Sequence, residues 1–421
     1  MTRRRIFLLG FLALLLLGVG LSCVYRVAWS DIQRTDYTVY TAAGQALLNH
    51  GDLYSAQNVR GWKYVYPPPF ALLMVPFARM SLASGALLWY LLEIAAIAAV
   101  SIMSVRLLPA TVPDRHKDLL YGLPLASLCV ILVSGAMRCQ ASVFMFALMV
   151  ATFYLHFRGR PIAAGASLAG AILMKVFPAV LVAYFIWRRQ WRVLLATAAS
   201  LLVMGLLLPG LALGWRQNLH DDARWVEVVA APALMSNHER ASSTPLFEQL
   251  MDTTKPRNQS LEAMFLSAGL GAESSKRLVT LSGGLMLLAM LLASRRVQNR
   301  HDELALAGAF LSWSLLVPPI SEAHYFGALI LPLTVLLGRI LYEATACSRQ
   351  QRQLAILLCG GTMLAAMRLL SWERTETLRP LGLATLLVWG ACLYSIMRHD
   401  KRHIWPEGPH KQSGAHTMYG Y

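Results

Sequence analysis

Apolar stretches, each about as long as a membrane-spanning helix, alternate with short polar segments along most of this chain. These stretches lie at 6–25, 84–106, 118–135, 141–157, 162–187, 192–213, 277–294, 303–319, 323–342, 354–371 and 379–397. A helix needs about 20 consecutive apolar residues to cross a bilayer. The pattern therefore predicts an all-α integral membrane protein, with a membrane domain over 1–398.

Three polar regions are longer than the turns between these stretches. We expect two of them, 26–83 and 214–276, to be long loops. The first is rich in aromatic residues, and its prolines at 67–69 predict a break followed by a re-entrant or interfacial segment, because proline supplies no backbone donor. The third region, 399–421, contains Gly, Pro, His and Lys and is expected to be a disordered cytoplasmic tail.

Composition agrees with a membrane protein. Of the 421 residues, 56% are hydrophobic and 14% are charged, with a mean hydropathy of +0.49. This is more apolar sequence than a soluble core could bury. A net charge of +16 would suggest nucleic acid in a soluble protein, but many Lys and Arg lie in short loops between apolar stretches, where they set topology. We therefore expect membrane lipids, and no nucleic acid, as partners.

The six cysteines lie mostly inside apolar stretches and show no CxxC spacing. They are Cys23, Cys129, Cys139, Cys347, Cys359 and Cys392. Neither a metal site nor a disulfide framework is indicated by such a distribution. We interpret them as small core residues.

The distribution of basic residues predicts the orientation of the chain. MTRRR precedes an apolar run that is long for a signal peptide and lacks a small-residue cleavage site, so we expect a retained first helix with a cytoplasmic N-terminus. Segment 26–83 then lies outside. A single crossing by 162–187 would also place the basic loop at 188–192 outside. This would contradict the positive-inside rule, by which loops rich in Lys and Arg face the cytoplasm.

Splitting 162–187 into two half-length segments, 162–174 and 176–187, restores the rule for that loop and for the later basic loops. The halves would meet at Lys175 near the outer side, followed by Pro178. Half-length helices need their junction buried in protein or lining a wet cavity. The result is about twelve segments with both termini in the cytoplasm.

On this topology, polar side chains converge on the outer face. They are Asp31, Asp36, Lys63, Tyr64, Tyr66, Arg138, Gln140, Lys175, His220, Asp221, Asp222, Glu227, His238, Glu239, Arg240, Lys255, Arg257, Asn258, Gln259, Glu322, His324 and Tyr325. A carboxylate among several cations suits transfer to a hydroxyl acceptor from a donor whose leaving group is an anionic lipid phosphate.

Four stretches carry a resemblance to a known family. They are AAGQALLNHGDLY (42–54) with YVYPPPFALLMVPF (64–77), AGAILMKVFPAVLVAYFIWRRQWR (169–192), RNQSLEAMF (257–265) and SEAHYFGALILP (321–332). Together with Asp36, their order and spacing resemble the polyprenol-phosphate-mannose-dependent mannosyltransferases of glycosyltransferase family 87, in the GT-C superfamily. Where members often show G-Q-x-N, this chain has Cys139, Gln140, Ala141 and Ser142.

The resemblance implies a GT-C helical bundle, a polyprenyl-phosphate donor of a mannose-like hexose, and inverting transfer to a lipid or glycan acceptor without a cofactor or metal. With the topology predicted above, the reaction is expected on the outer face of the bacterial inner membrane. An acidic residue of the first outer loop would be the general base, which corresponds to Asp36. Lys175 and His324 would lie near the donor phosphate. From their place on the same face, we add Arg138 and Arg257 as phosphate contacts, and Tyr66, Gln140, Asn258 and Gln259 as substrate-positioning residues.

Several of these residues have a simpler interpretation. Asp36 is a favoured N-cap for a helix beginning at Tyr37, and Lys175 could snorkel from one kinked helix. Tyr325 is interpreted as an interfacial aromatic residue. Asn258 and Gln259 could cap the following segment instead of contacting substrate.

The His220-Asp221-Asp222 cluster is expected to be solvated rather than metal-binding. For the whole chain, the alternative functions are a twelve-helix secondary transporter and a flippase-like protein for lipid-linked sugars. A transporter predicts related halves and short outer loops.

Overall fold

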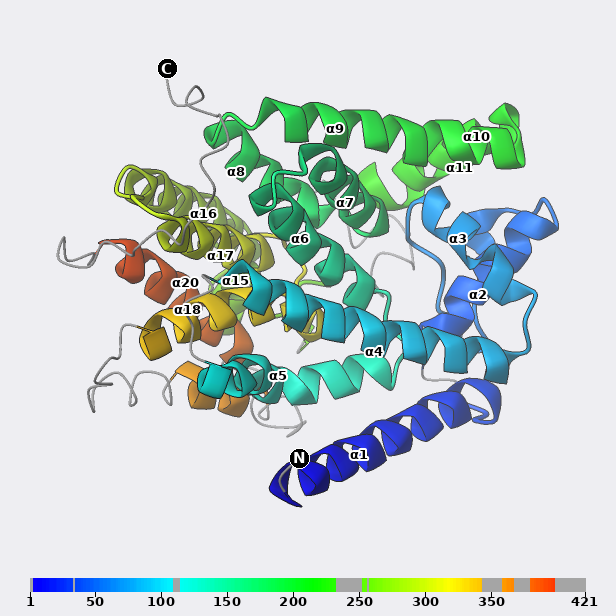
Figure 1. Ribbon diagram of the computed structural model, residues 1–421. Helices are drawn as coiled ribbons and strands as arrows, with labels where there is room; N and C mark the ends of the chain where they lie inside the picture. Colours follow the sequence, from blue (N-terminus) through cyan, green and yellow to red (C-terminus); the bar gives the residue numbers. More distant parts are fainter. Residues whose placement is uncertain are drawn as a thin grey trace.

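The computed structural model is helical over nearly all of the chain that it describes (Figure 1). The described residues are 3–32, 35–108, 114–231, 252–255, 257–342, 358–366 and 379–397. Seven helical stretches within them are long and apolar enough to cross a membrane. They lie in α1 (Arg3–Ala28), α4 (Leu82–Leu107), α5 (Asp114–Ala136), the run α9 (Trp191–Leu202), η3 (Val203–Leu207) and α10 (Leu208–Leu213), α16 (Ala272–Ser294), η5 (Ala323–Leu329) with α18 (Ile330–Tyr342), and α20 (Pro380–Met397).

Shorter helices complete the described structure. They are α2 (Tyr37–Leu48), η1 (Leu53–Ser55), α3 (Pro68–Ala78), α6 (Ser142–Phe157), α7 (Pro161–Met174), η2 (Phe177–Leu181), α8 (Val182–Trp187), α11 (Trp215–Trp225), η4 (Val226–Ala230), α15 (Leu261–Ser267) and α17 (Arg300–Leu316). The expected all-α membrane fold is confirmed, whereas the number twelve stays a prediction. Residues 358–366 are helical within the expected stretch 354–371, and the tail 399–421 lies outside the described residues.

Helix α17 is the centre of the bundle. Every residue from Leu304 to Leu316 is buried, and the helix packs against α18, α20 and α16. A helix that is apolar on all sides has no lipid- or water-facing stripe and belongs in the interior. Outer helices show the opposite pattern, since Leu195 and Leu211 on α9 and α10, and Leu387 on α20, are more than 70% exposed.

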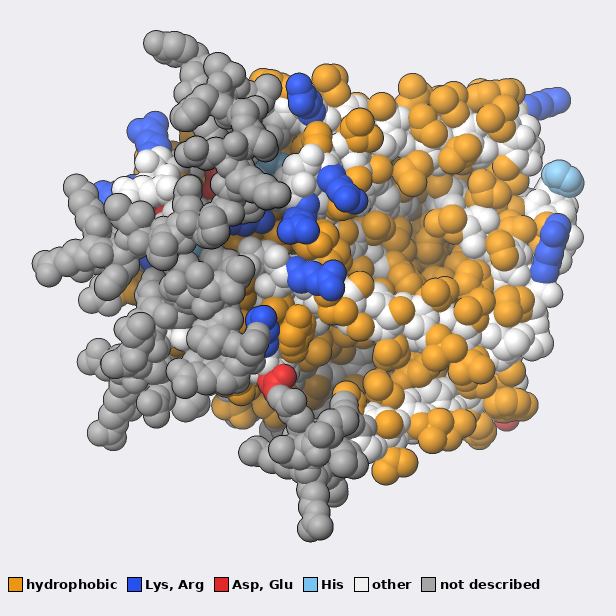
Figure 2. All heavy atoms as spheres, in the orientation of Figure 1, with side chains coloured by type: hydrophobic (Ala, Val, Ile, Leu, Met, Phe, Trp, Pro, Cys, Tyr) orange, Lys and Arg blue, Asp and Glu red, His pale blue; other side chains and the backbone are white. Residues whose placement is uncertain are grey.

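Much of the outer surface is apolar, as expected for a protein surrounded by lipid. Figure 2 shows hydrophobic side chains over a broad area of one face, with Lys and Arg lying toward its two ends. Exposed leucines on α1, α4 and α16 contribute to such apolar surface. Together with the seven candidate spans, this surface identifies a membrane protein.

The stretch 162–187 is divided at Lys175, as the charge pattern predicted. Lys175 follows α7 in an extended conformation, with φ −153° and ψ 136°, and the chain returns through η2 and α8. Pro178 is in the first turn of η2, where its missing N–H does not interrupt a helix. Because α7 has 14 residues, it is about 21 Å long and too short to cross a bilayer core of about 30 Å.

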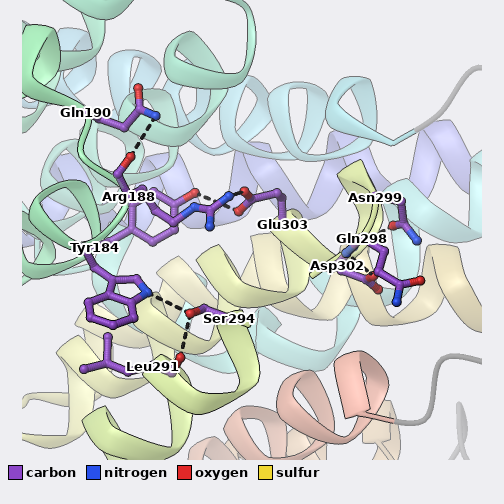
Figure 3. A network of polar contacts seen from close by, with 10 residues as sticks. Tyr184, Arg188, Gln190, Leu291, Ser294, Gln298, Asn299, Asp302 and Glu303 are labelled. Atoms are coloured by element: carbon purple, nitrogen blue, oxygen red, sulfur yellow. Dashed lines mark hydrogen bonds and ion pairs between the residues drawn. The ribbon is translucent and has the colours of Figure 1, made fainter. Parts of the chain in front are cut away.

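Arginine-rich turns gather at one end of the bundle, and Figure 3 shows one contact there, between Arg188 and Glu303. Arg188, after α8, forms an ion pair with Glu303 on α17, and the Tyr184 hydroxyl donates to the same carboxylate over 3.4 Å. Arg300, at the start of α17, donates to the carbonyl of Phe157 at the end of α6 over 3.1 Å. These contacts hold the ends of three helices together.

Helix direction places Lys175 at the opposite end. Helix α7 begins beside the arginine-rich turns and runs away from them to Lys175, and η2 with α8 leads back to Arg188. Helix α17 also runs away from these turns, so its last residue, Leu316, leads into 317–322 at the same end as Lys175. The split therefore brings the basic loop 188–192 beside the earlier basic turn at 158–160.

Helices α2 and α3 pack together beyond the end of the first span (Figure 1). A Cβ at Gly44 of α2 would lie 2.9 Å from the carbonyl oxygen of Met74 on α3, so only glycine permits this approach. Helix α3 begins at Pro68, as the prolines predicted, and α11 contacts it. The indole of Trp225 on α11 donates to the carbonyl of Val65 over 3.2 Å.

Candidate active site

Asp36 lies directly before α2 and is fixed there by its backbone. Its carbonyl accepts from the amides of Val39 and Tyr40 (3.0 and 3.1 Å), and its amide donates to the carbonyl of Arg138 over 3.1 Å. The side chain makes no capping hydrogen bond. The interpretation of Asp36 as a side-chain N-cap is therefore wrong, because its backbone is in the αR region with φ −81° and ψ −20° rather than the extended region of a capping residue.

Tyrosines connect α2 with the turn between α5 and α6. The hydroxyls of Tyr40 and Tyr66 are 3.0 Å apart, and the Tyr40 hydroxyl accepts from the amide of Ala141 over 3.4 Å. Gln140 in this turn is buried. These contacts bring the first polar segment and the Arg138–Gln140 turn to one place.

Lys175 lies between two aromatic rings. Its ammonium nitrogen is 5.4 Å from the ring centre of Tyr66 and 4.1 Å from that of Tyr325, and it donates a hydrogen bond to the Tyr325 hydroxyl. Phe177 stacks on Tyr325 with ring centres 5.2 Å apart. Tyr325 is buried, so its interpretation as an interfacial belt residue is wrong: the break after α7 places Lys175 against it.

Glu322 and His324 complete a polar cluster that also contains Asp36, Arg138 and Lys175. Nε2 of His324 lies 3.0 Å from Oε2 of Glu322. Burial raises the pKa of the Glu322 carboxyl, but His324, Lys175 and Arg138 together outweigh burial and hold that pKa below its usual range. Glu322 is thus an anion that feels the positive charges of Lys175 and Arg138. The sequence predicts Glu322 among the outward-facing groups but assigns it no role; its place two residues before His324 is the signal that could have found it.

Charges of both signs act on the Asp36 carboxyl. Burial and the negative charge of Glu322 raise its pKa to about 7, although the positive charges of Lys175, Arg138 and Arg257 act to lower it. Asp36 is partly exposed and Arg257 is exposed, so solvent or a substrate can reach the cluster. A carboxyl with a pKa near neutrality can accept a proton at physiological pH.

Asn258 and Gln259 hold the segment that carries Glu322. The Asn258 side chain donates to the carbonyls of Thr253 (3.1 Å) and Pro319 (2.8 Å) and accepts from the amides of Ser260 (3.2 Å) and Ser321 (2.8 Å). Four bonds use the whole capacity of an amide, which favours a structural role over a substrate contact.

Gln259 is also engaged with backbone. Its amide donates to the carbonyl of Ser321 over 2.8 Å, and its side-chain oxygen accepts from the amide of Leu381 over 3.2 Å. The following helix, α15, is capped instead by Ser260, whose hydroxyl accepts from Ala263 over 3.2 Å. The interpretation of Asn258 and Gln259 as side-chain caps of that helix is therefore wrong.

Replacing Asn258 by Ala should destabilise the protein by roughly 2–4 kcal/mol, because buried backbone groups lose their partners. Thermal unfolding in detergent measures the loss. Gln298→Ala is the control, because the Gln298 side chain is exposed. Its backbone amide, which donates to Asp302 over 3.2 Å, is unchanged by the substitution. An unchanged unfolding midpoint for Asn258→Ala would contradict the structural role.

Other polar groups lie on separate elements. Asp221 and Asp222 are on α11, where Asp221 accepts from Gln217 (3.0 and 3.1 Å) and Asp222 from Asn218 (3.4 Å). Asp31 is exposed after α1. His238, Glu239 and Arg240 lie outside the described residues.

The family of the chain follows from comparison with known proteins. The model of glycosyltransferase family 87 matches residues 64–319, more than half of the 421 residues. A polyprenol-phosphate-mannose-dependent alpha-(1-2)-phosphatidylinositol mannoside mannosyltransferase from Mycolicibacterium smegmatis is 28% identical over 353 residues, covering 78% of this chain and 74% of that protein. The protein of the same description from Mycobacterium tuberculosis is 24% identical over 395 residues, covering 89% and 84%.

Among solved structures, ArnT from Cupriavidus metallidurans in the apo state aligns with a TM-score of 0.40 and 16% identity, covering 93% of this chain and 77% of that chain. The family match separates an enzyme from the transporter and flippase-like alternatives. The resemblance seen in the sequence motifs is confirmed by that match. The chain therefore belongs to glycosyltransferase family 87 and is a membrane glycosyltransferase.

Proposed function

We propose that this enzyme transfers a mannose-like hexose from a polyprenyl-phosphate donor to a hydroxyl of a lipid or glycan acceptor. The polyprenol-phosphate-mannose dependence of its relatives, given in their names, supports the donor. The observation that carries the chemistry is the backbone contact between Asp36 and Arg138 (3.1 Å), with a carboxyl whose pKa is under the influence of the positive charges of Lys175, Arg138 and Arg257. This arrangement joins a proton acceptor with cations suited to an anionic leaving group.

In the proposed reaction, Asp36 removes the proton from the acceptor hydroxyl as its oxygen attacks the anomeric carbon. The bond from that carbon to the donor phosphate oxygen breaks, and polyprenyl phosphate leaves with the electron pair. A direct displacement inverts the configuration at the anomeric carbon. Lys175, Arg138, Arg257 and His324 would stabilise the charge that develops on the phosphate, as preorganised donors do in other transfer reactions.

Orientation is part of the proposal. The arginine-rich turns at 158–160, 188–192 and 295–300 gather at the end opposite Lys175, and cytoplasmic loops are enriched in such residues. We infer that this end faces the cytoplasm and that the candidate site opens on the outer face of the inner membrane. Both termini would then be cytoplasmic.

The proposal is tested with purified protein, labelled polyprenyl-phosphate mannose and an extract of membrane lipids and glycans as acceptors. Formation of a labelled product that requires the lipid-linked donor is the expected result. Transfer from a nucleotide sugar, with none from the lipid-linked donor, would refute it. An outer-facing site is tested separately by reacting Arg257→Cys with a membrane-impermeant thiol reagent in intact spheroplasts.

Activity should rise with pH through an apparent pKa of about 7, because Asp36 must lose its proton to act as a base. Replacing Glu322 by Gln removes a negative charge that raises the Asp36 pKa. The rising limb of kcat/KM should therefore move to lower pH in Glu322→Gln. A pH profile of both proteins measures the shift, and a limb that stays in place or moves upward would contradict this assignment of Glu322.

A further inference from the structure

Two cysteines far apart in the sequence meet beside the candidate site. Cys23 lies on α1, and Cys139 lies in the turn between α5 and α6, 116 positions later. Their Sγ atoms are 2.8 Å apart, and both residues are fully buried. A disulfide bond holds its sulfurs about 2.05 Å apart, so a shift of less than an ångström joins them.

The backbone conformation of the turn that carries Cys139 is a second observation about this pair. Its φ is 52°, in the left-handed region that favours glycine. The turn imposes this conformation, since the Cys139 amide donates to the Ala136 carbonyl over 3.0 Å and the Gln140 amide to the Gly135 carbonyl over 3.2 Å. These bonds hold the Cys139 backbone, and with it the thiol, in place beside Cys23.

We propose that Cys23 and Cys139 form a disulfide that ties the first membrane helix to the turn carrying Arg138. This inference rests on the orientation given above as part of the proposed function, which places Cys23 near the outer end of α1 and Cys139 in the outer turn between α5 and α6. Disulfides form and persist in extracytoplasmic compartments, which are oxidising. All five described cysteines, this pair included, are thiols in the structure, and of these five it is Cys23 and Cys139 whose Sγ atoms lie 2.8 Å apart.

The bond forms by thiol–disulfide exchange with an extracytoplasmic protein disulfide. The thiolate of one cysteine attacks the oxidant's disulfide, and the second thiolate then displaces the oxidant from the mixed disulfide. The two cysteines lose two protons and two electrons in total, and the oxidant is released as a dithiol. Exchange takes place during membrane insertion, before the folded protein buries the pair.

The bond would constrain the backbone that holds Asp36. The Asp36 amide donates to the carbonyl of Arg138, the residue before Cys139, over 3.1 Å. Cys23 is also on the helix that leads into the segment carrying Asp36. A covalent link between α1 and this turn therefore fixes both sides of the Asp36 backbone.

Differential alkylation tests the bond directly. Membranes containing the full chain are quenched with acid to stop exchange, dissolved in denaturant and treated with N-ethylmaleimide. After reduction, the newly released thiols are treated with isotope-labelled N-ethylmaleimide, and peptides are identified by mass spectrometry. Cys23 and Cys139 should carry the second label, whereas Cys129, Cys359 and Cys392 should carry the first.

Serine variants make the test independent of burial. In Cys23→Ser the partner Cys139 should change to the first label, and in Cys139→Ser the same should happen to Cys23. Each single variant and the double variant should lower the thermal midpoint by the same amount, about 5 °C, because all three remove one and the same bond. Midpoint losses that add in the double variant would indicate two separate packing contacts and overturn the proposal.

Labelling also separates this inference from the proposed function, since it needs no transferase activity. First label on Cys23 and Cys139 of the wild type, together with normal transfer from polyprenyl-phosphate mannose, would refute the disulfide and leave the enzyme assignment in place. Second label on the pair with no transfer from any lipid-linked donor would establish the disulfide and refute the assignment.

Discussion

Replacing Asp36 by Asn should reduce kcat for sugar transfer about 10³-fold, the effect typical of losing a general base. Asparagine has nearly the same shape but cannot accept the acceptor's proton. The backbone bonds of Asp36 to Arg138, Val39 and Tyr40 do not depend on its side chain and should persist. Initial rates with labelled donor, at saturating donor and acceptor, measure the change.

Asp31→Asn is the matched control, because Asp31 is another aspartate of the same segment, exposed after α1. We expect it to retain wild-type kcat. Binding of polyprenyl phosphate, measured by its effect on the thermal midpoint, should survive in Asp36→Asn because the cations remain. Full activity in Asp36→Asn would remove Asp36 from its assigned role.

Replacing Lys175 by Met should lower kcat/KM for the lipid-linked donor by about 10²-fold or more. Methionine keeps an apolar stem of similar length but has no charge to offer the leaving phosphate, and lost stabilisation of a developing anion has effects of this size. The measurement is a donor titration at fixed acceptor. A fall in kcat with little change in KM would indicate that Lys175 acts chiefly in the transition state.

Two variants separate the charge of Lys175 from its packing. Tyr325→Phe removes the hydroxyl that accepts from Lys175 but keeps the ring beneath the ammonium, so it should cost only about 3- to 10-fold. Lys276→Met, on the first turns of α16, should have no effect on transfer. A Lys175→Met enzyme as active as wild type would contradict a role at the phosphate.

Much of this architecture follows from local sequence. Apolar length predicts the membrane helices because only a helix of sufficient length satisfies its backbone groups in lipid. The distribution of basic residues favoured a split of 162–187 over a single kinked span, and the break at Lys175 is found. Prolines at 67–69 predicted the start of α3 for a similarly local reason, since their missing donors and fixed φ suit a first helical turn.

Other features depended on which segments meet. Nothing around Tyr325 signals that Lys175, 150 positions away, donates to its hydroxyl. Glu322 was visible in the sequence, but its influence on the pKa of Asp36 depends on the fold. The Asn258 side chain holds the segment before Glu322 through hydrogen bonds to the backbone of Pro319 and Ser321. Likewise, Cys23 and Cys139 show no motif spacing, because the helices that bring them together are separated by long stretches of chain.

The amino-acid sequence by itself therefore determined the membrane class, the helical breaks and the residue types available for chemistry, since these depend on neighbours within a few turns. Tertiary structure alone decided which polar groups share one site, because helix packing joins positions that no periodicity connects. It also decided the electrostatic state of the site: the basicity of Asp36 depends on burial and on charges brought from four other segments.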